Sequence, residues 1–163
     1  MKNHRILEAV MFAIECVKSE TRRLQAGVSE RAVAHRLAVH MESQFEDWDI
    51  DCEYNRRGPR FPKELDGIVE CEESRTTDRI LPDIIVHHRT NEAGPKDDDN
   101  LLVIELKNDN GEDVCDRRKL ELFTDPGGYY KYQLGLYINV GNHEFTRTWY
   151  QDGVQIAENE LGA

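Results

Sequence analysis

Two apolar runs, ILPDIIVHH at residues 80–88 and NLLVIELK at residues 100–107, decide how this chain folds. Both are rich in Ile, Leu and Val, which predicts two buried strands. The residues between them are rich in Gly, Pro, Asn and Asp, as is typical of a hairpin connection. Each run carries an acid at its edge, Asp83 in the first and Glu105 in the second. Because a folded protein rarely tolerates such a carboxylate without a partner charge or a metal, the runs also predict a site.

Strand geometry indicates the chemistry of this site. Side chains alternate between the two faces of a strand, so Glu105 and Lys107 point the same way while Leu106 points into the opposite layer. We expect the carboxylates of Asp83 and Glu105 and the ammonium of Lys107 to converge. Carboxylate oxygens suit a hard cation such as Mg2+, which is commonly held by one or two of them. Lys107 cannot bind a metal while protonated, but it can orient a water or stabilise charge on a phosphate.

Pro82-Asp83 on one strand and Glu105-Leu106-Lys107 on its neighbour resemble the PD-(D/E)XK phosphodiesterase superfamily, which has the restriction-endonuclease-like fold. The resemblance implies an α/β domain with a mixed sheet and an αβββαβ core, with an extra N-terminal helix and a C-terminal β-hairpin. It implies that Asp83, Glu105 and the backbone carbonyl of Leu106 bind Mg2+, with Mn2+ able to substitute. It also implies hydrolysis of nucleic acid, with DNA the expected substrate. From residue 29 to about residue 140, the sequence is similar to a bacterial or phage group of stand-alone superfamily members.

A helix upstream supplies a further acid. Ser29 is the expected N-cap, and Val33, Leu37 and Met41 recur at intervals of four and form one apolar stripe. Glu30 lies in the first turn, close to this stripe, and can reach inward. The resemblance implies that such a glutamate supports the metal. A glutamate at a helix start is also favoured by the macrodipole and can stay in solvent, so both interpretations stand.

The rest of the chain predicts an ordered series of elements. An N-terminal helix is expected over residues 2–24 and a strand over 47–56, with Asp49, Asp51 and Glu53 on one face. Residues 57–79 predict a long excursion that either reads substrate or is variable padding. Asp113 is expected to cap a helix over 114–124, followed by a strand over 130–141. Asp152-Gly153 is suited to a tight primed turn in a closing hairpin.

Charge argues against a simple nuclease, because the formal net charge of -11 repels phosphate backbones at long range. Basic residues nevertheless cluster locally. We expect four of them to bind substrate, namely Arg56, Arg57, Arg117 and Lys119.

Several other side chains allow two interpretations each. Lys119 either leans toward the site or is solvated on its helix. Glu53 is either a further acid of the site or a surface carboxylate. His87 is either a metal neighbour and proton carrier or an exposed strand-end histidine. The tyrosines either stack on bases or pack on a helix, and they are Tyr129, Tyr130, Tyr132 and Tyr137.

Composition fits one enzyme domain over residues 1–163, because 163 residues with 39% hydrophobic content can build one real core. The four cysteines contain no C-x-x-C pair, which favours reduced thiols and a cytoplasmic protein. Glu8 and Glu15 interrupt the first apolar run, which predicts an amphipathic helix rather than a signal peptide. No run is long and apolar enough to span a bilayer.

Two other functions remain open. The chain can be a silent nuclease-like scaffold, or a subunit that engages a basic partner protein within a defence or repair complex. It can also hydrolyse another phosphorylated substrate, since the motif specifies metal chemistry better than substrate. The sequence leaves open whether two copies form a homodimer.

Overall fold

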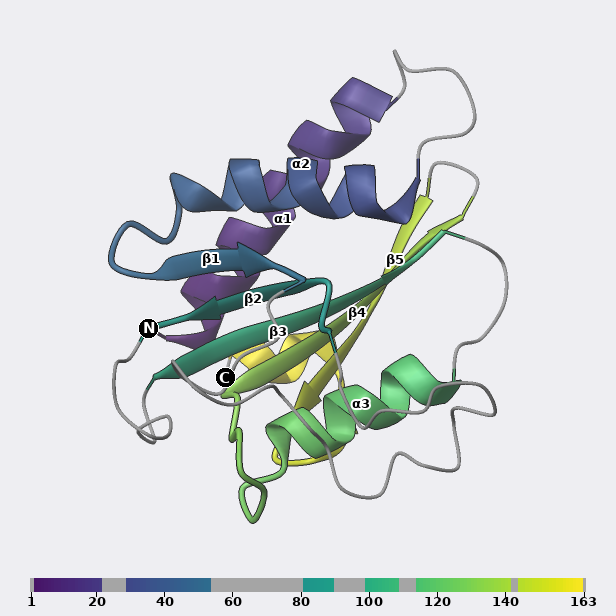
Figure 1. Ribbon diagram of the computed structural model, residues 1–163. Coiled ribbons are helices and arrows are strands. Elements are labelled where there is room, and N and C mark those ends of the chain that lie inside the picture. The colour runs from purple at the N-terminus through teal and green to yellow at the C-terminus, as the bar shows by residue number, and fades with distance from the viewer. Residues whose placement is uncertain are drawn as a thin grey trace.

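Helices cover both faces of a mixed sheet in the computed structural model, which describes residues 2–21, 29–53, 81–89, 99–108, 114–141 and 144–162 (Figure 1). Within these residues, α1 (Asn3–Thr21) and α2 (Glu30–Glu42) lie on one face and α3 (Val114–Thr124) lies on the other. The mixed α/β class predicted from the sequence is therefore confirmed. No helix of the described part combines the length and apolarity that crossing a membrane requires.

In the described residues the sheet contains six strands in sequence order, and each pair of neighbours is antiparallel except one. The exception is the parallel pair of β3 and β4. A parallel pair needs a crossover, and α3 lies between these two strands in sequence. The strands are β1 (Asp49–Cys52), β2 (Ile84–His87), β3 (Asn100–Lys107), β4 (Leu134–Gly141), β5 (Glu144–Gln151) and β6 (Val154–Ile156).

The predicted helices occur close to their expected positions. Ser29 caps α2, since its Oγ accepts a hydrogen bond of 3.3 Å from the amide of Ala32. Val33, Leu37 and Met41 are buried, as the stripe predicts. Of the helix expected over residues 2–24, Asn3–Thr21 is confirmed, and residues 22–24 lie outside the described residues. The Asp113 cap and the excursion at 57–79 also lie outside them.

An ion-pair cluster fixes the two N-terminal helices to each other. Glu20 of α1 accepts hydrogen bonds of 2.8 and 2.6 Å from Arg36 of α2, and its Oε1 lies 2.9 Å from Nε2 of His40. The hydrogen bond from Arg36 is the main reason that the pKa of Glu20 falls to about 2. This cluster joins α1 to the helix that begins at Glu30, alongside the shared hydrophobic core of the two helices.

The strands also follow the prediction, with two differences. The strand predicted over 47–56 is confirmed at Asp49–Cys52 and was too long, because residues 47, 48 and 53 are not in the strand; residues 54–56 lie outside the described part. The strand predicted over 130–141 was too long, because β4 begins at Leu134. The amide of Tyr132 donates to the carbonyl of Phe123 at the end of α3, and the amide of Gln133 donates to the carbonyl of Asn100 in β3, so residues 130–133 link the helix to β3 without forming a strand. The primed turn is confirmed by φ angles of 52° at Asp152 and 77° at Gly153.

The two faces of the sheet bury different clusters. The face under α1 and α2 carries a large aliphatic core that includes Ile84, Ile104 and Leu136. The face under α3 carries a smaller cluster, comprising Ile85, Val103, Leu120, Phe123, Tyr130, Tyr132, Tyr137 and Tyr150. Of the four tyrosines for which the sequence allows base stacking, Tyr130, Tyr132 and Tyr137 are buried in the core and Tyr129 is exposed. Core packing therefore accounts for the three buried ones. Alternation along β3 places Glu105 and Lys107 on the α3 face.

Gly135 allows α3 to approach the sheet closely. A Cβ atom at this position of β4 would lie 3.1 Å from Cγ2 of Thr124 and 3.2 Å from Cβ of Tyr150. Both distances are tighter than ordinary van der Waals contact, and the neighbours belong to the helix and to β5. The absence of a side chain at Gly135 therefore determines how near α3 comes to β3 and β4.

We expect Gly135→Val to lower the free energy of unfolding by about 1–3 kcal/mol, because overpacking forces the helix and strand apart. Urea denaturation would measure the change. Gly127→Val is the matched control, since a Cβ there meets only the side chain of Asp125, and an effect of about 0.5 kcal/mol or less is expected. Equal effects at the two glycines would contradict the close approach of α3.

Candidate active site at the end of β3

The two predicted acids face each other across neighbouring strands. Ile84 pairs with Ile104, so Asp83, one residue before β2, lies opposite Glu105. Oδ2 of Asp83 accepts a hydrogen bond of 2.7 Å from the amide of Leu106. A strand residue turns its N–H and C=O toward the same neighbour, so the Leu106 carbonyl is also directed to the Asp83 side. Two carboxylates and one backbone carbonyl thus gather where β2 begins and β3 ends.

The surroundings of Asp83 disfavour its negative charge. Burial is the main cause that raises the pKa of Asp83, and repulsion from Glu30 and Glu53 raises it further. The hydrogen bond from Leu106 and attraction by Lys119 act in the opposite direction and are outweighed. A raised pKa at a carboxylate among other acids is typical of a functional position.

Glu30 lies at the end of β3, as the inward interpretation of the sequence expects. Its Oε1 accepts a hydrogen bond of 2.9 Å from the amide of Asn108, the residue after β3. Helix α2 therefore delivers a carboxylate to the same end of the sheet as Asp83. Glu53 remains at the rim, where its side chain is 43% exposed and pairs with Arg31 at 2.6 Å. The interpretation of Glu53 as a surface carboxylate describes it better.

Lys119 of α3 leans toward the acids and not into solvent. Its Nζ lies 2.7 Å from Oδ1 of Asp116 and 4.0 Å from Oε2 of Glu105. The side chain of Lys119 is 15% exposed and that of Glu105 is 4% exposed, so the charges interact away from bulk water. The solvated interpretation of Lys119 was therefore wrong. Its ammonium compensates part of the negative charge of the site.

Two of the other predicted basic residues, Lys107 and Arg117, lie in the described part of the chain. Lys107 is half-buried, two residues beyond Glu105, and pairs in register with Asn139 of β4. Arg117 lies on α3, and its guanidinium carbon is 4.7 Å from the ring centre of Tyr137. Tyr137 is the β4 partner of Glu105. Arg56 and Arg57 lie outside the described residues.

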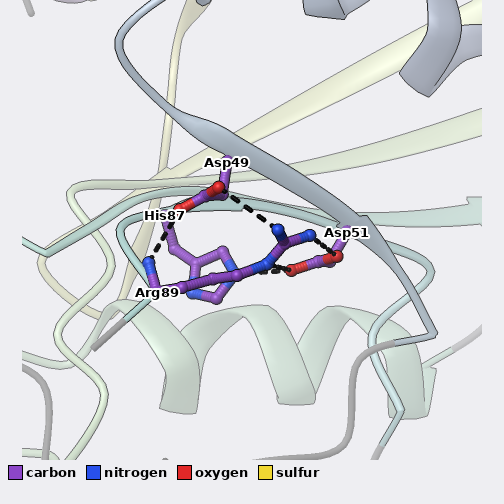
Figure 2. Close-up of polar contacts among 4 residues, drawn as sticks. All are labelled: Asp49, Asp51, His87 and Arg89. Carbon is purple, nitrogen blue, oxygen red and sulfur yellow. Dashed lines mark hydrogen bonds and ion pairs between the residues drawn. The ribbon is translucent and has the colours of Figure 1, made fainter. Parts of the chain in front are cut away.

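Sequence reasoning missed a second polar cluster, at the outer edge of the sheet (Figure 2). Nε2 of His87 lies 2.9 Å from Oδ2 of Asp51, and Nε of Arg89 donates to the same oxygen at 3.0 Å. The amide of Arg89 donates to Asp49 at 2.9 Å. Burial opposes ionisation of Asp51, but the hydrogen bonds from Arg89 and His87 prevail and lower its pKa.

This cluster decides the alternatives left open for His87. The residue is 6% exposed and bonded to Asp51, so the interpretation of an exposed strand-end histidine was wrong. Acids at 49 and 51 and bases at 87 and 89 share the alternation of their strands. Matching these two alternations across an antiparallel pair was the signal that could have found the cluster.

The donors at the end of β3 fit a hard cation. Asp83 and Glu105 offer carboxylate oxygens and Leu106 a carbonyl oxygen, which are the ligands that Mg2+ prefers. The raised pKa of Asp83 shows that an additional positive charge there would be favourable. Among the described residues, no three His, Cys, Asp or Glu side chains form a metal-binding group. A site with two carboxylates is what Mg2+ commonly uses, with water as the remaining ligands.

Asp83→Asn is expected to raise the free energy of unfolding at neutral pH. The pKa of Asp83 is higher in the folded than in the unfolded chain, so the ionised carboxylate costs stability at neutral pH. This cost disappears as the pH falls through the folded-state pKa toward the unfolded value. Asparagine removes the charge and keeps an oxygen that can accept from Leu106.

Urea denaturation of both proteins across a pH series would measure this difference. The gain should be largest at neutral pH and should vanish in acid. The exposed Asp47 provides the control, since Asp47→Asn should leave stability nearly unchanged. A loss of stability in Asp83→Asn at neutral pH, or a gain that is the same at every pH, would contradict the assigned electrostatics.

The chain was compared with known proteins at three levels. No protein-family model matches the sequence, no curated protein is similar enough to match it, and no solved structure matches its fold.

Proposed function

We propose that this protein is a Mg2+-dependent nuclease that hydrolyses phosphodiester bonds, with DNA as the expected substrate. The proposal depends chiefly on the hydrogen bond from Leu106 to Asp83, which holds one carboxylate opposite Glu105 across adjoining strands. The chain order of helices, three strands, helix and three strands supports a restriction-endonuclease-like fold. The motif of Pro82-Asp83 with Glu105-Leu106-Lys107 agrees with this proposal.

Each residue of the site has a role in the proposed reaction. Asp83, Glu105 and the carbonyl of Leu106 would hold Mg2+, which supplies Lewis acidity and lowers the pKa of a water molecule. Lys107 would position the attacking water or offset negative charge that develops on the phosphate. Glu30 would support the site through water from the start of α2.

The proposed reaction is a simple hydrolysis. The oxygen of water forms a bond to phosphorus, and the bond between phosphorus and the leaving sugar oxygen breaks. The water loses one proton to solvent, and the leaving oxygen gains one. Lys119, fixed near Glu105, would keep part of the acidic charge compensated while a negatively charged substrate approaches.

We place this reaction in the cytoplasm, as the cysteine pattern favours. Among the described residues, Cys16, Cys52 and Cys115 form no disulfide, which agrees with a reducing compartment.

The contacts of Lys119 also favour a second candidate function. Its ammonium already neutralises part of the charge of Asp116 and Glu105, so the acidic site is partly compensated without a metal. A nuclease-like scaffold that engages a basic partner protein would have this property. Lys107 distinguishes the two functions. A nuclease needs this lysine for cleavage, whereas a scaffold does not cleave and does not need it.

We expect the purified protein to cleave at least one member of a panel of single- and double-stranded DNA and RNA in Mg2+, and to stop in EDTA. Lys107→Ala should lose on the order of 100-fold or more in rate, because it removes a charge next to the reacting phosphate. Gel analysis of labelled substrates would measure both effects. Lys2→Ala is the control, since Lys2 is exposed at the N-terminus.

The outcomes separate the two functions. Cleavage that survives in Lys107→Ala would indicate a contaminating nuclease. Absence of cleavage across the whole panel would favour the scaffold. A rise of the melting temperature with Mg2+ in the wild type but not in Asp83→Asn would report metal binding independently of turnover.

A further inference from the structure

Arg117 differs from Arg36 and Arg147, the other partly buried arginines of the described chain, because no carboxylate of the described residues pairs with it. Its Nη1 contacts two neutral oxygens, Oγ1 of Thr148 and the hydroxyl of Tyr150, each at the long distance of 3.4 Å. Its Nε is buried and has no hydrogen-bond acceptor in the described part of the chain. By contrast, an ion pair to a carboxylate holds each of Arg31, Arg36, Arg89, Arg118 and Arg147.

This uncompensated charge requires an explanation. A guanidinium carries five N–H donors and stays protonated in proteins, so it cannot avoid the cost of burial by losing its charge. Two long contacts to hydroxyls and the ring of Tyr137 satisfy only part of its capacity. In a chain with a net charge of -11, a carboxylate partner would be easy to provide. Since no carboxylate of the described residues takes this place, the position favours an external anion.

The register of the sheet places Arg117 beside the candidate active site. Glu105 of β3 pairs with Tyr137 of β4, and Tyr137 pairs with Thr148 of β5. Neighbouring strands lie roughly 4.8 Å apart. Arg117 contacts both Tyr137 and Thr148, so its guanidinium lies one to two strands from Glu105, on the side away from Asp83.

The row of neighbouring residues that runs from Asp83 and Glu105 through Tyr137 to Thr148 therefore changes from acidic to basic along its length. Asp83 and Glu105 supply oxygen ligands for a cation at one end, and Arg117 with Thr148 supplies donors for an anion at the other. A nucleic-acid backbone carries one negative phosphate per nucleotide at a regular spacing. A backbone that crosses from β3 toward β5 would bring a second phosphate to Arg117 while the first lies at the acids.

We propose that Arg117, together with the hydroxyl of Thr148, binds the backbone phosphate next to the one hydrolysed at Asp83 and Glu105. This inference rests on the proposed nuclease function and adds the direction of the substrate, from β3 across β4 to β5. The Tyr150 hydroxyl and the Tyr137 ring hold the guanidinium in place. Arg117 contributes to substrate binding and takes no part in bond breaking.

Binding of a labelled single-stranded oligonucleotide, followed by fluorescence anisotropy in EDTA at several salt concentrations, tests this subsite without turnover. Arg117→Gln should weaken binding about tenfold or more, because a charge-assisted contact is lost. It should also reduce the slope of log K against log salt by about 0.7, the contribution of one phosphate on a single strand. A purely structural role for Arg117 would not change this slope.

Arg118→Gln is the matched control, since it removes the same charge from the neighbouring residue of α3. Arg118 is paired with Glu121 on the exposed side of the helix, so affinity and slope should stay close to the wild type. Arg117→Lys should keep the wild-type slope and lose part of the affinity, because it retains the charge but not the planar fork. This variant also guards against a folding defect in Arg117→Gln.

The results distinguish this inference from the nuclease proposal. Arg117-dependent binding without cleavage of any substrate would support the phosphate subsite and overturn the nuclease. Cleavage combined with binding that ignores Arg117→Gln would overturn the subsite and support the nuclease. An equal loss in Arg118→Gln, or no measurable binding by the wild type at low salt, would also overturn the subsite.

Discussion

The hydrogen bond of 2.7 Å from the Leu106 amide to Asp83 is the contact on which the candidate site depends. Leu106 lies beyond the last pair that β3 forms with β2, so its amide would otherwise lack a strand acceptor on that side. A carboxylate takes the place of a strand, and the backbone thereby fixes the position of a charged group. The same contact continues the sheet and orients an acid, so pairing in the sheet and construction of the site cannot be separated.

Helix α3 supplies what the strands do not, namely positive charge close to the acids. Gly135 lets the helix come near the sheet. Lys119 then reaches Glu105 of β3, and Arg117 reaches Tyr137 of β4. The two side chains differ in their partners, since Lys119 interacts with carboxylates whereas Arg117 contacts hydroxyls and a ring. One helix thus compensates the acids with Lys119 and brings a second cation, Arg117, to the ring of Tyr137. Both effects depend on the parallel crossover between β3 and β4.

Much of this arrangement could be predicted from local sequence. The apolar runs around residues 84–87 and 100–107, the Ser29 cap and the Asp152-Gly153 turn each follow from patterns within a few residues. The start of β4 could not, because the amide of Tyr132 bonds to a distant helix end. The contacts of His87 and Lys119 were also beyond local patterns, since they depend on which strands and helices become neighbours. Long-range pairing, and not propensity, decided the features that sequence reasoning missed.

The cluster of Asp49, Asp51, His87 and Arg89 has a consequence for how the molecule behaves among copies of itself. β1 is an outermost strand, and a long apolar edge there would offer unpaired backbone groups to another chain. This edge is instead four residues long, and its acids are held by Arg89 and His87 (Figure 2). A second sheet that docked against this edge would bring its backbone close to these charged side chains and remove water from them. Short length and paired charges at this edge of the described sheet therefore disfavour strand-to-strand association between molecules.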